Sequence, residues 1–272
     1  MDPPARSGYA PGMFDALIAR GFQFEFASHA KAILTVDFPD AIDELTMALD
    51  QVSIPIEEII GSGGGEAKGT QRLRRALADL GWPKAKFVVE KTVNGRSLGS
   101  TSHEVDHVRA FEKGVVALEI EWNNKDPFFD RDLENFKRLH ADGAISLGVI
   151  VTRGSGLQDS LTALIRRFAD ERSVTGIESL SALSLNPTKR QQADYERRVR
   201  GGITFQEAWS TSFVQDKFGQ ATTHWRKLDD RLHRGVGNPC PLILVGLPAS
   251  IVTFGEDLDV ERIVGGDDAA IG

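Results

Sequence analysis

The chain has 272 residues, of which 41% are hydrophobic and 26% are charged, and its net charge is −7. Such a composition supports a globular protein with one or two domains, and it excludes a chain that is mainly disordered, collagen-like or coiled coil. No stretch reaches the roughly eighteen consecutive apolar residues of a membrane span, and the first residues lack the apolar core of a signal peptide. We therefore expect a cytoplasmic protein with no membrane partner.

The charge is unevenly distributed along the chain. Residues 1–58 hold ten acidic and three basic side chains, residues 255–272 hold six and one, and the part between them has a net charge of +5. We expect residues 1–254 to form a single domain and the acidic tail, residues 255–272, to be loosely ordered. A polar stretch within the domain could follow a phosphate backbone or form a solvated helix face, because it contains Lys189, Arg190, Arg197, Arg198 and Arg200.

The first part of the chain is predicted to contain several helices. One is expected near Met13–Arg20, and another is opened by the sequence Asp37-Phe38-Pro39-Asp40 and runs to about Asp50. A glycine-rich break at residues 61–65 precedes Glu66–Leu80, which has the apolar stripe of an amphipathic helix.

From residue 85 the apolar period changes from that of a helix to that of strands. Two long strands are joined by the tight loop Glu112-Lys113, and a helix then leads to a nearly continuous apolar strand. This order predicts a parallel βαβ unit. The predicted strands are Phe87–Val89, His103–Phe111, Gly114–Trp122, Ile145–Thr152 and Pro241–Leu247, and the predicted helices are Asp130–Gly143 and Leu157–Ala169.

The register of the predicted hairpin brings three acidic residues together. With Glu112 and Lys113 as the loop, Asp106 lies opposite Glu119, and Glu121 shares their face of the sheet. Exposed acids on an edge hairpin would give the same pattern, but Glu119 and Glu121 lie in the apolar run GVVALEIEW. Buried carboxylates repel one another and need a cation, and oxygen ligands of this kind suit Mg²⁺ better than zinc.

Asp106 and Glu119-Ile120-Glu121, followed by the helix FDRDLENFKRLHADG and the strand AISLGVIVTRG, resemble the BglII/BamHI group of type II restriction endonucleases, which are variants of the PD-(D/E)xK nuclease fold. The likeness is strongest over residues 61–153 and extends to the segment TTHWRKLDDRLHRGVGNPCPLILVGLP. It implies a mixed α/β fold with a restriction-endonuclease-like core over about residues 61–170. In such a core helices flank a central mixed sheet, and a catalytic hairpin precedes the βαβ unit.

The resemblance also implies roles for residues of the hairpin. Asp106 and Glu119 match the acids that bind the metal, and Ile120 matches the position whose backbone carbonyl completes the metal shell. Glu121 stands where most of the superfamily has lysine. Because BamHI has glutamate there, Glu121 could act as a base or as a ligand of a second metal ion.

Two residues outside the hairpin are further candidates. The superfamily often adds an acid from a preceding helix, for which Glu66 is the candidate, although a glutamate in a first helical turn is also favoured by the helix dipole. Lys125 could supply the ammonium that is missing at position 121.

The function implied by the resemblance is Mg²⁺-dependent, sequence-specific hydrolysis of double-stranded DNA, with one or two ions per active site. A homodimer would match a palindromic site, and a cognate DNA methyltransferase would protect the host genome. Near the end of the chain His224 and Arg226 could contact the DNA, although a helix that packs into the core explains that segment as well.

The sequence His103-Glu104-Val105-Asp106-His107 also matches the zinc-protease motif, in which two histidines one helical turn apart hold the ion. Its flanks alternate like a strand, and no third ligand is obvious downstream. We therefore expect His103 and His107 to be ordinary polar residues on the strand face opposite Asp106, and we keep a metalloprotease as an alternative. A non-cleaving DNA-binding protein of the same fold is the other alternative.

Overall fold

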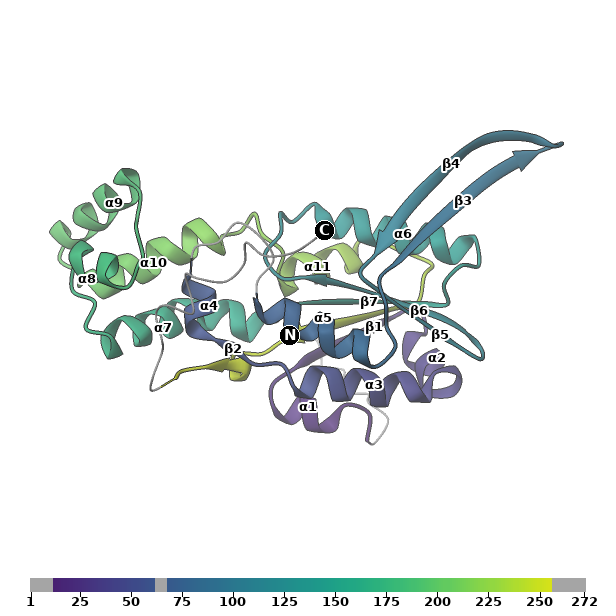
Figure 1. The fold of residues 1–272 in the computed structure, drawn as a ribbon, viewed down its shortest axis with the longest axis horizontal. Coiled ribbons are helices and arrows are strands. Elements are labelled where there is room, and N and C mark those ends of the chain that lie inside the picture. Colours follow the sequence, from purple (N-terminus) through teal and green to yellow (C-terminus); the bar gives the residue numbers. More distant parts are fainter. Residues whose placement is uncertain (1–11, 62–67, 256–272) are drawn as a thin grey trace, which may run out of the picture.

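The computed structural model describes residues 12–61 and 68–255, and a five-stranded mixed sheet lies at the centre of this part of the chain (Figure 1). The strand order is β1-β8-β7-β6-β5, with β6, β7 and β8 parallel and the two edge strands antiparallel to their neighbours. The strands are β1 (Gln23–Ala27), β5 (His107–Phe111), β6 (Gly114–Glu121), β7 (Leu147–Arg153) and β8 (Leu242–Leu247).

Helices cover both faces of this sheet, which explains why every residue of β7 and β8 is buried. Alternate side chains of β6 enter two separate apolar clusters: Val116 and Leu118 pack on one side and Ala117 on the other. The first side is covered by α1 (Asp15–Ala19), α2 (Ala30–Asp37), α3 (Pro39–Asp50), α5 (Lys68–Asp79) and α7 (Ser155–Glu171), and the second by α6 (Phe128–Ala141) and α11 (Trp225–His233).

The predicted βαβ unit is confirmed as β6, α6 and β7, with β6 and β7 parallel. Helix α6 buries Leu133, Phe136 and Leu139 against the sheet. It approaches closely because β7 has Gly148 under the Phe136 ring, where a Cβ atom would lie 2.5 Å from a ring carbon. This close contact fixes the height of α6 above the strand that carries the acidic residues.

The remaining elements extend from opposite ends of the molecule (Figure 1). At one end the two-stranded hairpin β3 (Ala85–Val93) and β4 (Arg96–Val105) projects away from the body, and at the other lie α8 (Ile177–Ala182), α9 (Lys189–Arg200) and α10 (Phe205–Lys217). Short elements complete the body: α4 (Ile56–Ile60), the parallel pair β2 (Ile54–Pro55) and β9 (Val252–Thr253), and a 3₁₀ turn at Ala249–Ile251.

The predicted register of the β5–β6 hairpin is confirmed, from Phe111 opposite Gly114 to His107 opposite Leu118. The prediction of one continuous strand over residues 103–111 is wrong, because the chain breaks at Asp106 and residues 96–105 pair with β3 instead. Strand β1, which pairs with β8, was not predicted. Over residues 12–61 and 68–255, no helix has both the length and the apolar character that a membrane crossing needs.

Candidate active site

Strand β6 directs Glu119 and Glu121 toward α6, on the face of the sheet opposite Leu118 and Ile120. The two glutamates are only 3% and 2% exposed. Because a central strand is covered on both faces, its polar side chains cannot reach water. The prediction that these acids are buried rather than solvent-facing is confirmed.

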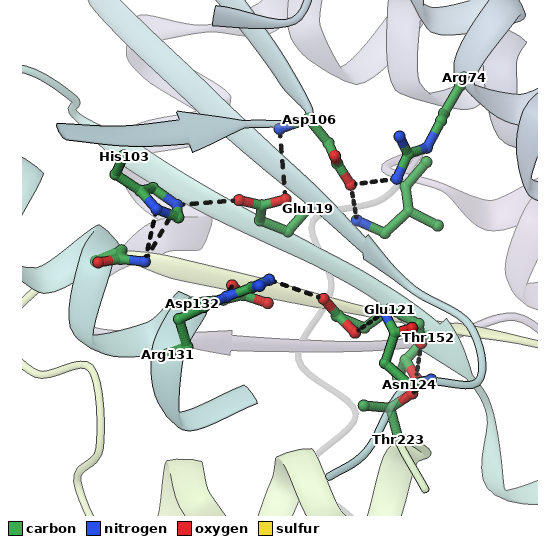
Figure 2. Close-up of polar contacts among 12 residues, drawn as sticks. Arg74, His103, Asp106, Glu119, Glu121, Asn124, Arg131, Asp132, Thr152 and Thr223 are labelled. Atoms are coloured by element: carbon green, nitrogen blue, oxygen red, sulfur yellow. Dashed lines mark hydrogen bonds and ion pairs between the residues drawn. The ribbon is translucent and has the colours of Figure 1, made fainter. Parts of the chain in front are cut away.

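Asp106 lies at the break between β4 and β5, where hydrogen bonds that involve its carboxylate and the Glu119 carboxylate stand in place of backbone hydrogen bonds between strands. Its backbone N–H donates to Glu119 Oε2 at 3.4 Å, and its carboxylate accepts from the backbone N–H of Ile120 at 3.3 Å. The same carboxylate oxygen accepts from Arg74 of α5 at 2.7 Å. Asp106 is therefore beside Glu119, as predicted, but its carboxylate points to Arg74 (Figure 2).

A second acid faces Glu119 from α6. Oxygen atoms of Glu119 and Asp132 and a ring nitrogen of His103 all lie within 4.8 Å of one another, and His103 Nε2 is 3.3 Å from Glu119 Oε1 (Figure 2). Asn135, one turn after Asp132, places Nδ2 at 2.9 and 3.1 Å from the two ring nitrogens. The prediction that His103 is an ordinary polar residue away from the acids is wrong.

The close packing of these acids strongly disfavours their ionised forms. Burial raises the pKa of Glu119 to about 10, and the charges of Asp132 and Asp106 add to this effect. Burial and the charge of Asp132 raise the pKa of Glu121 to about 8, and burial also raises the pKa of Asp132. Without a cation the cluster would therefore hold protons at neutral pH.

Both carboxylate oxygens of Glu121 accept hydrogen bonds, and one of the two donors, Arg131, also binds Asp132. Asn124 Nδ2 donates to one carboxylate oxygen at 2.5 Å and Arg131 Nη2 donates to the other at 3.3 Å. Asn124 is itself fixed by the backbone and side chain of Thr223, at 2.8 and 3.1 Å. Buried Arg153 donates to the Thr223 carbonyl at 2.7 Å and so ties the segment before α11 to the end of β6.

The residues present fit a divalent metal ion. Asp132 is fully buried, and its Oδ2 atom has no hydrogen-bond partner among the described residues. Its other oxygen accepts from Arg131 Nε at 2.7 Å, so one oxygen remains directed at the cluster. A buried carboxylate oxygen without a partner, facing a second buried acid, is costly unless the group takes up a proton or a cation neutralises it, and a divalent cation can neutralise both acids at once.

Sequence reasoning missed Asp132, although a signal was present. Phe129, Asp132 and Phe136 are three and four residues apart, so Asp132 occupies the buried stripe of α6. A charged residue inside an otherwise apolar stripe is rare unless it is paired or binds a metal. His103 was singled out only as a possible zinc ligand of the HEVDH motif, because its place beside Glu119 depends on the break at Asp106.

The predicted basic residues do not gather at this cluster. Arg197 and Arg198 of α9 pair with Asp194, and α9 lies at the end of the molecule opposite the β3–β4 hairpin (Figure 1). Arg226 pairs with Asp159 at 2.6 Å. His224 is 1% exposed, so it does not face a ligand at the surface as predicted.

The other candidates also differ from the prediction. Lys125 is exposed in the loop after β6, and Glu66 lies outside the described residues. The HEVDH segment is not helical: His103 is in β4, His107 in β5, and exposed Glu104 pairs with Lys84 at 2.6 Å. The zinc-protease alternative is therefore not favoured, because that motif needs both histidines on one helix.

The chain is similar to one family of known proteins. The family model described as restriction endonuclease BglII/BglIII matches residues 22–247. This span contains the central sheet, the β5–β6 hairpin and helix α6 with Asp132. No curated protein matches the chain.

Proposed function

The chain belongs to the BglII/BglIII restriction endonuclease family, whose members act on double-stranded DNA, and we propose that it is a Mg²⁺-dependent, sequence-specific type II endonuclease. The observation that carries this proposal is the buried cluster of Glu119, Glu121 and Asp132 at the end of β6. Such a concentration of buried acids is suited to holding a cation next to a scissile phosphate.

Glu119 would hold Mg²⁺ together with Asp106 and the backbone carbonyl of Ile120, in a site for one or two ions. In phosphodiester hydrolysis the ion polarises the phosphate, stabilises its added negative charge and lowers the pKa of a bound water. Arg74 already accompanies the Asp106 carboxylate at 2.7 Å. That contact restrains the Asp106 carboxylate beside the Ile120 amide.

Glu121 is the proposed general base. Asn124 and Arg131 fix both of its carboxylate oxygens, so it is oriented to accept the proton of the attacking water. As the water oxygen bonds to phosphorus, the bond between phosphorus and the 3′ oxygen breaks. The products are a 5′-phosphate and a 3′-hydroxyl.

A cavity beside the cluster offers a route for the DNA strand. It has a volume of about 680 Å³, lies between the β3–β4 hairpin and α6, and reaches His103 and Asn135 of the acidic site. Lys91 and Arg138 also line it. Basic side chains at such a position attract a phosphate backbone without reading its sequence.

The wider biological setting follows from the restriction role. We propose a homodimer, in which each subunit cuts one strand of a palindromic site, and a cognate DNA methyltransferase that protects the host genome. Both would act in the cytoplasm, where the chromosome of a restricting cell is accessible.

The proposal is tested by incubating unmethylated duplex DNA of known sequence with the protein in Mg²⁺ or EDTA. We expect discrete fragments in Mg²⁺ only, and we expect Glu119→Gln to abolish detectable cleavage, because it removes a carboxylate proposed to hold the ion. Glu104→Gln is the matched control. It removes the exposed glutamate of HEVDH and should cut like the wild type.

The possible results separate the competing functions. A Glu104→Gln variant without activity, beside an active Glu119→Gln variant, would contradict the nuclease site. DNA that is bound but uncut by the wild type, whatever its methylation state, would instead indicate a non-cleaving DNA-binding protein.

A further inference from the structure

His103, Glu119 and Asp132 come from three different elements, β4, β6 and α6, yet their ligand atoms lie within 4.8 Å of one another. Figure 2 shows the imidazole directed at the Glu119 carboxylate, with Asp132 beside both. One oxygen of the Asp106 carboxylate, Oδ2, instead accepts from Arg74 and from the Ile120 amide. The cluster around His103 is therefore a ligand set separate from the Asp106 carboxylate, although it shares Glu119 with it.

The state of Asp132 is the independent indication that a ligand belongs there. This side chain has no exposed surface, and its Oδ2 atom is without a hydrogen-bond partner among residues 12–61 and 68–255. Arg131 contacts only the other oxygen, and Arg131 itself is half exposed. Leaving a buried carboxylate oxygen unsatisfied costs free energy that a bound cation would recover.

Asn135 gives the imidazole a fixed direction. Its Nδ2 atom contacts the His103 ring, and its own Oδ1 accepts from Arg138, so the amide cannot rotate freely. The Nδ2 atom is a donor, so it restrains the ring through a nitrogen that carries a lone pair, and a lone pair of this kind is what a cation would take over. Asn135 therefore acts as a positioning residue for His103.

We propose that His103, Glu119 and Asp132 bind one divalent ion and that the imidazole makes this site select Mn²⁺ over Mg²⁺. Mg²⁺ takes oxygen ligands and retains much of its water, whereas first-row transition ions also accept imidazole nitrogen. This inference deepens the proposed function. It depends on the proposed function only for the statement that the ion lies next to the reacting phosphate.

Mn²⁺ binding to the full chain without DNA tests the ligand set directly. We expect the wild type to bind Mn²⁺ more tightly than Mg²⁺ and to show nitrogen coupling from imidazole in pulsed electron paramagnetic resonance. His103→Ala should abolish the coupling and weaken binding by at least the roughly 10–100-fold that loss of an outer-shell partner costs. His140→Ala is the matched control, because His140 contacts only the Ile145 carbonyl among the described partners of its ring.

Asp132→Asn provides a second test that does not depend on His103. In EDTA this variant should have a melting temperature no lower than that of the wild type, because asparagine keeps the shape of the aspartate and the buried carboxyl has no cation to bind. Addition of Mn²⁺ should raise the melting temperature of the wild type but not that of the variant. A variant that fails to fold would show a lower melting temperature in EDTA, which is opposite to the expectation and would overturn the proposal.

The outcomes also separate this inference from the proposed function. Unchanged Mn²⁺ affinity in His103→Ala and Asp132→Asn, with loss in Asp106→Asn, would overturn the inference while leaving the Mg²⁺ nuclease intact. Nitrogen coupling in the wild type together with uncut DNA would support the inference and refute the nuclease.

Discussion

At the scale of single residues, some neighbours of Glu121 raise the pKa of its carboxyl group and others lower it. Burial and Asp132 raise the pKa of this carboxyl to about 8, while Asn124 and Arg131 act to lower it. A base with a pKa near the working pH transfers protons efficiently, so this balance suits the proposed role. The same balance makes the free energy of unfolding depend on pH.

The direction of that dependence follows from the two pKa values. The folded pKa of about 8 exceeds the unfolded value of 4.5, so between these pH values the folded protein binds more protons than the unfolded chain. Metal-free protein should therefore lose stability as pH rises from about 4.5 to about 8, by on the order of 1.4 kcal/mol per pKa unit at most. Above that window Glu121 adds no further loss.

Thermal unfolding in EDTA at a series of pH values checks this prediction. The melting temperature of Glu121→Gln minus that of the wild type should grow between pH 5 and pH 8. Glu104→Gln serves as the control, because Lys84 lowers the pKa of Glu104 and its removal gives no such increase. A difference that does not change with pH would show that burial does not shift the proton affinity of Glu121.

The sequence predicts some of these residues and not others for a physical reason. Glu119 and Glu121 follow from strand register, since a period of two and a tight loop determine which side chains share a face. Asp132 and His103 depend on where α6 and β4 lie above that face. Those positions are set by tertiary packing, such as the Phe136 ring over Gly148, which no local pattern encodes.

At the scale of elements, the break at Asp106 decides the shape of the site. A strand that continued through residue 106 would keep β4 in the main sheet. Instead, the Asp106 carboxylate accepts a hydrogen bond from the Ile120 amide, and the Asp106 amide donates one to the Glu119 carboxylate. Residues 96–105 are then free to pair with β3. A side chain that replaces one backbone hydrogen bond of a sheet does not change the hydrophobic periodicity of the sequence. The sequence therefore predicts one strand where the structure has two.

The outer part of the β3–β4 hairpin should be dispensable for folding. Its residues are exposed and pair only with each other, and Val93 and Leu98 are among the exposed large apolar side chains. Replacing residues 91–99 by Asn-Gly joins the opposed residues Glu90 and Ser100 with a favourable two-residue turn. We expect a change in the free energy of unfolding of less than about 1 kcal/mol, since no core surface is lost.

Chemical denaturation of the shortened protein checks this expectation. The control is Val105→Ala at the base of β4, a fully buried position whose truncation should cost about 2 kcal/mol. If the shortened hairpin were the more destabilised of the two, its outer strands would have to contribute to the core. DNA affinity should fall in the shortened protein, because Lys91 is removed from the cavity wall together with Leu98 and Gly99.

At the scale of the whole molecule, two sets of basic side chains lie at opposite ends: those of the β3–β4 hairpin and the cavity beside it, and those of α9 (Figure 1). The cavity with Lys91 and Arg138 adjoins the acidic cluster, whereas α9 is packed on α10 beyond α7. Several basic residues of α9 are already engaged by acids of the same helix, among them Arg197, Arg198 and Arg200. The basic cluster visible in the sequence thus resembles a solvated helix face, and charge composition alone could not reveal its distance from the active site.

Salt dependence of DNA binding distinguishes the two regions, because each phosphate contact contributes about 0.9 to the slope of log affinity against log salt. Removing Lys91 and Arg138 together, as Lys91→Gln and Arg138→Gln, should lower the slope by about 1.8 per subunit. Removing Lys189, Arg190 and Arg200 by substitution with glutamine should leave it unchanged. A reduced slope in the α9 variant alone would place the DNA along the helical end, and the cavity beside Asn135 would then not be the path of the cleaved strand.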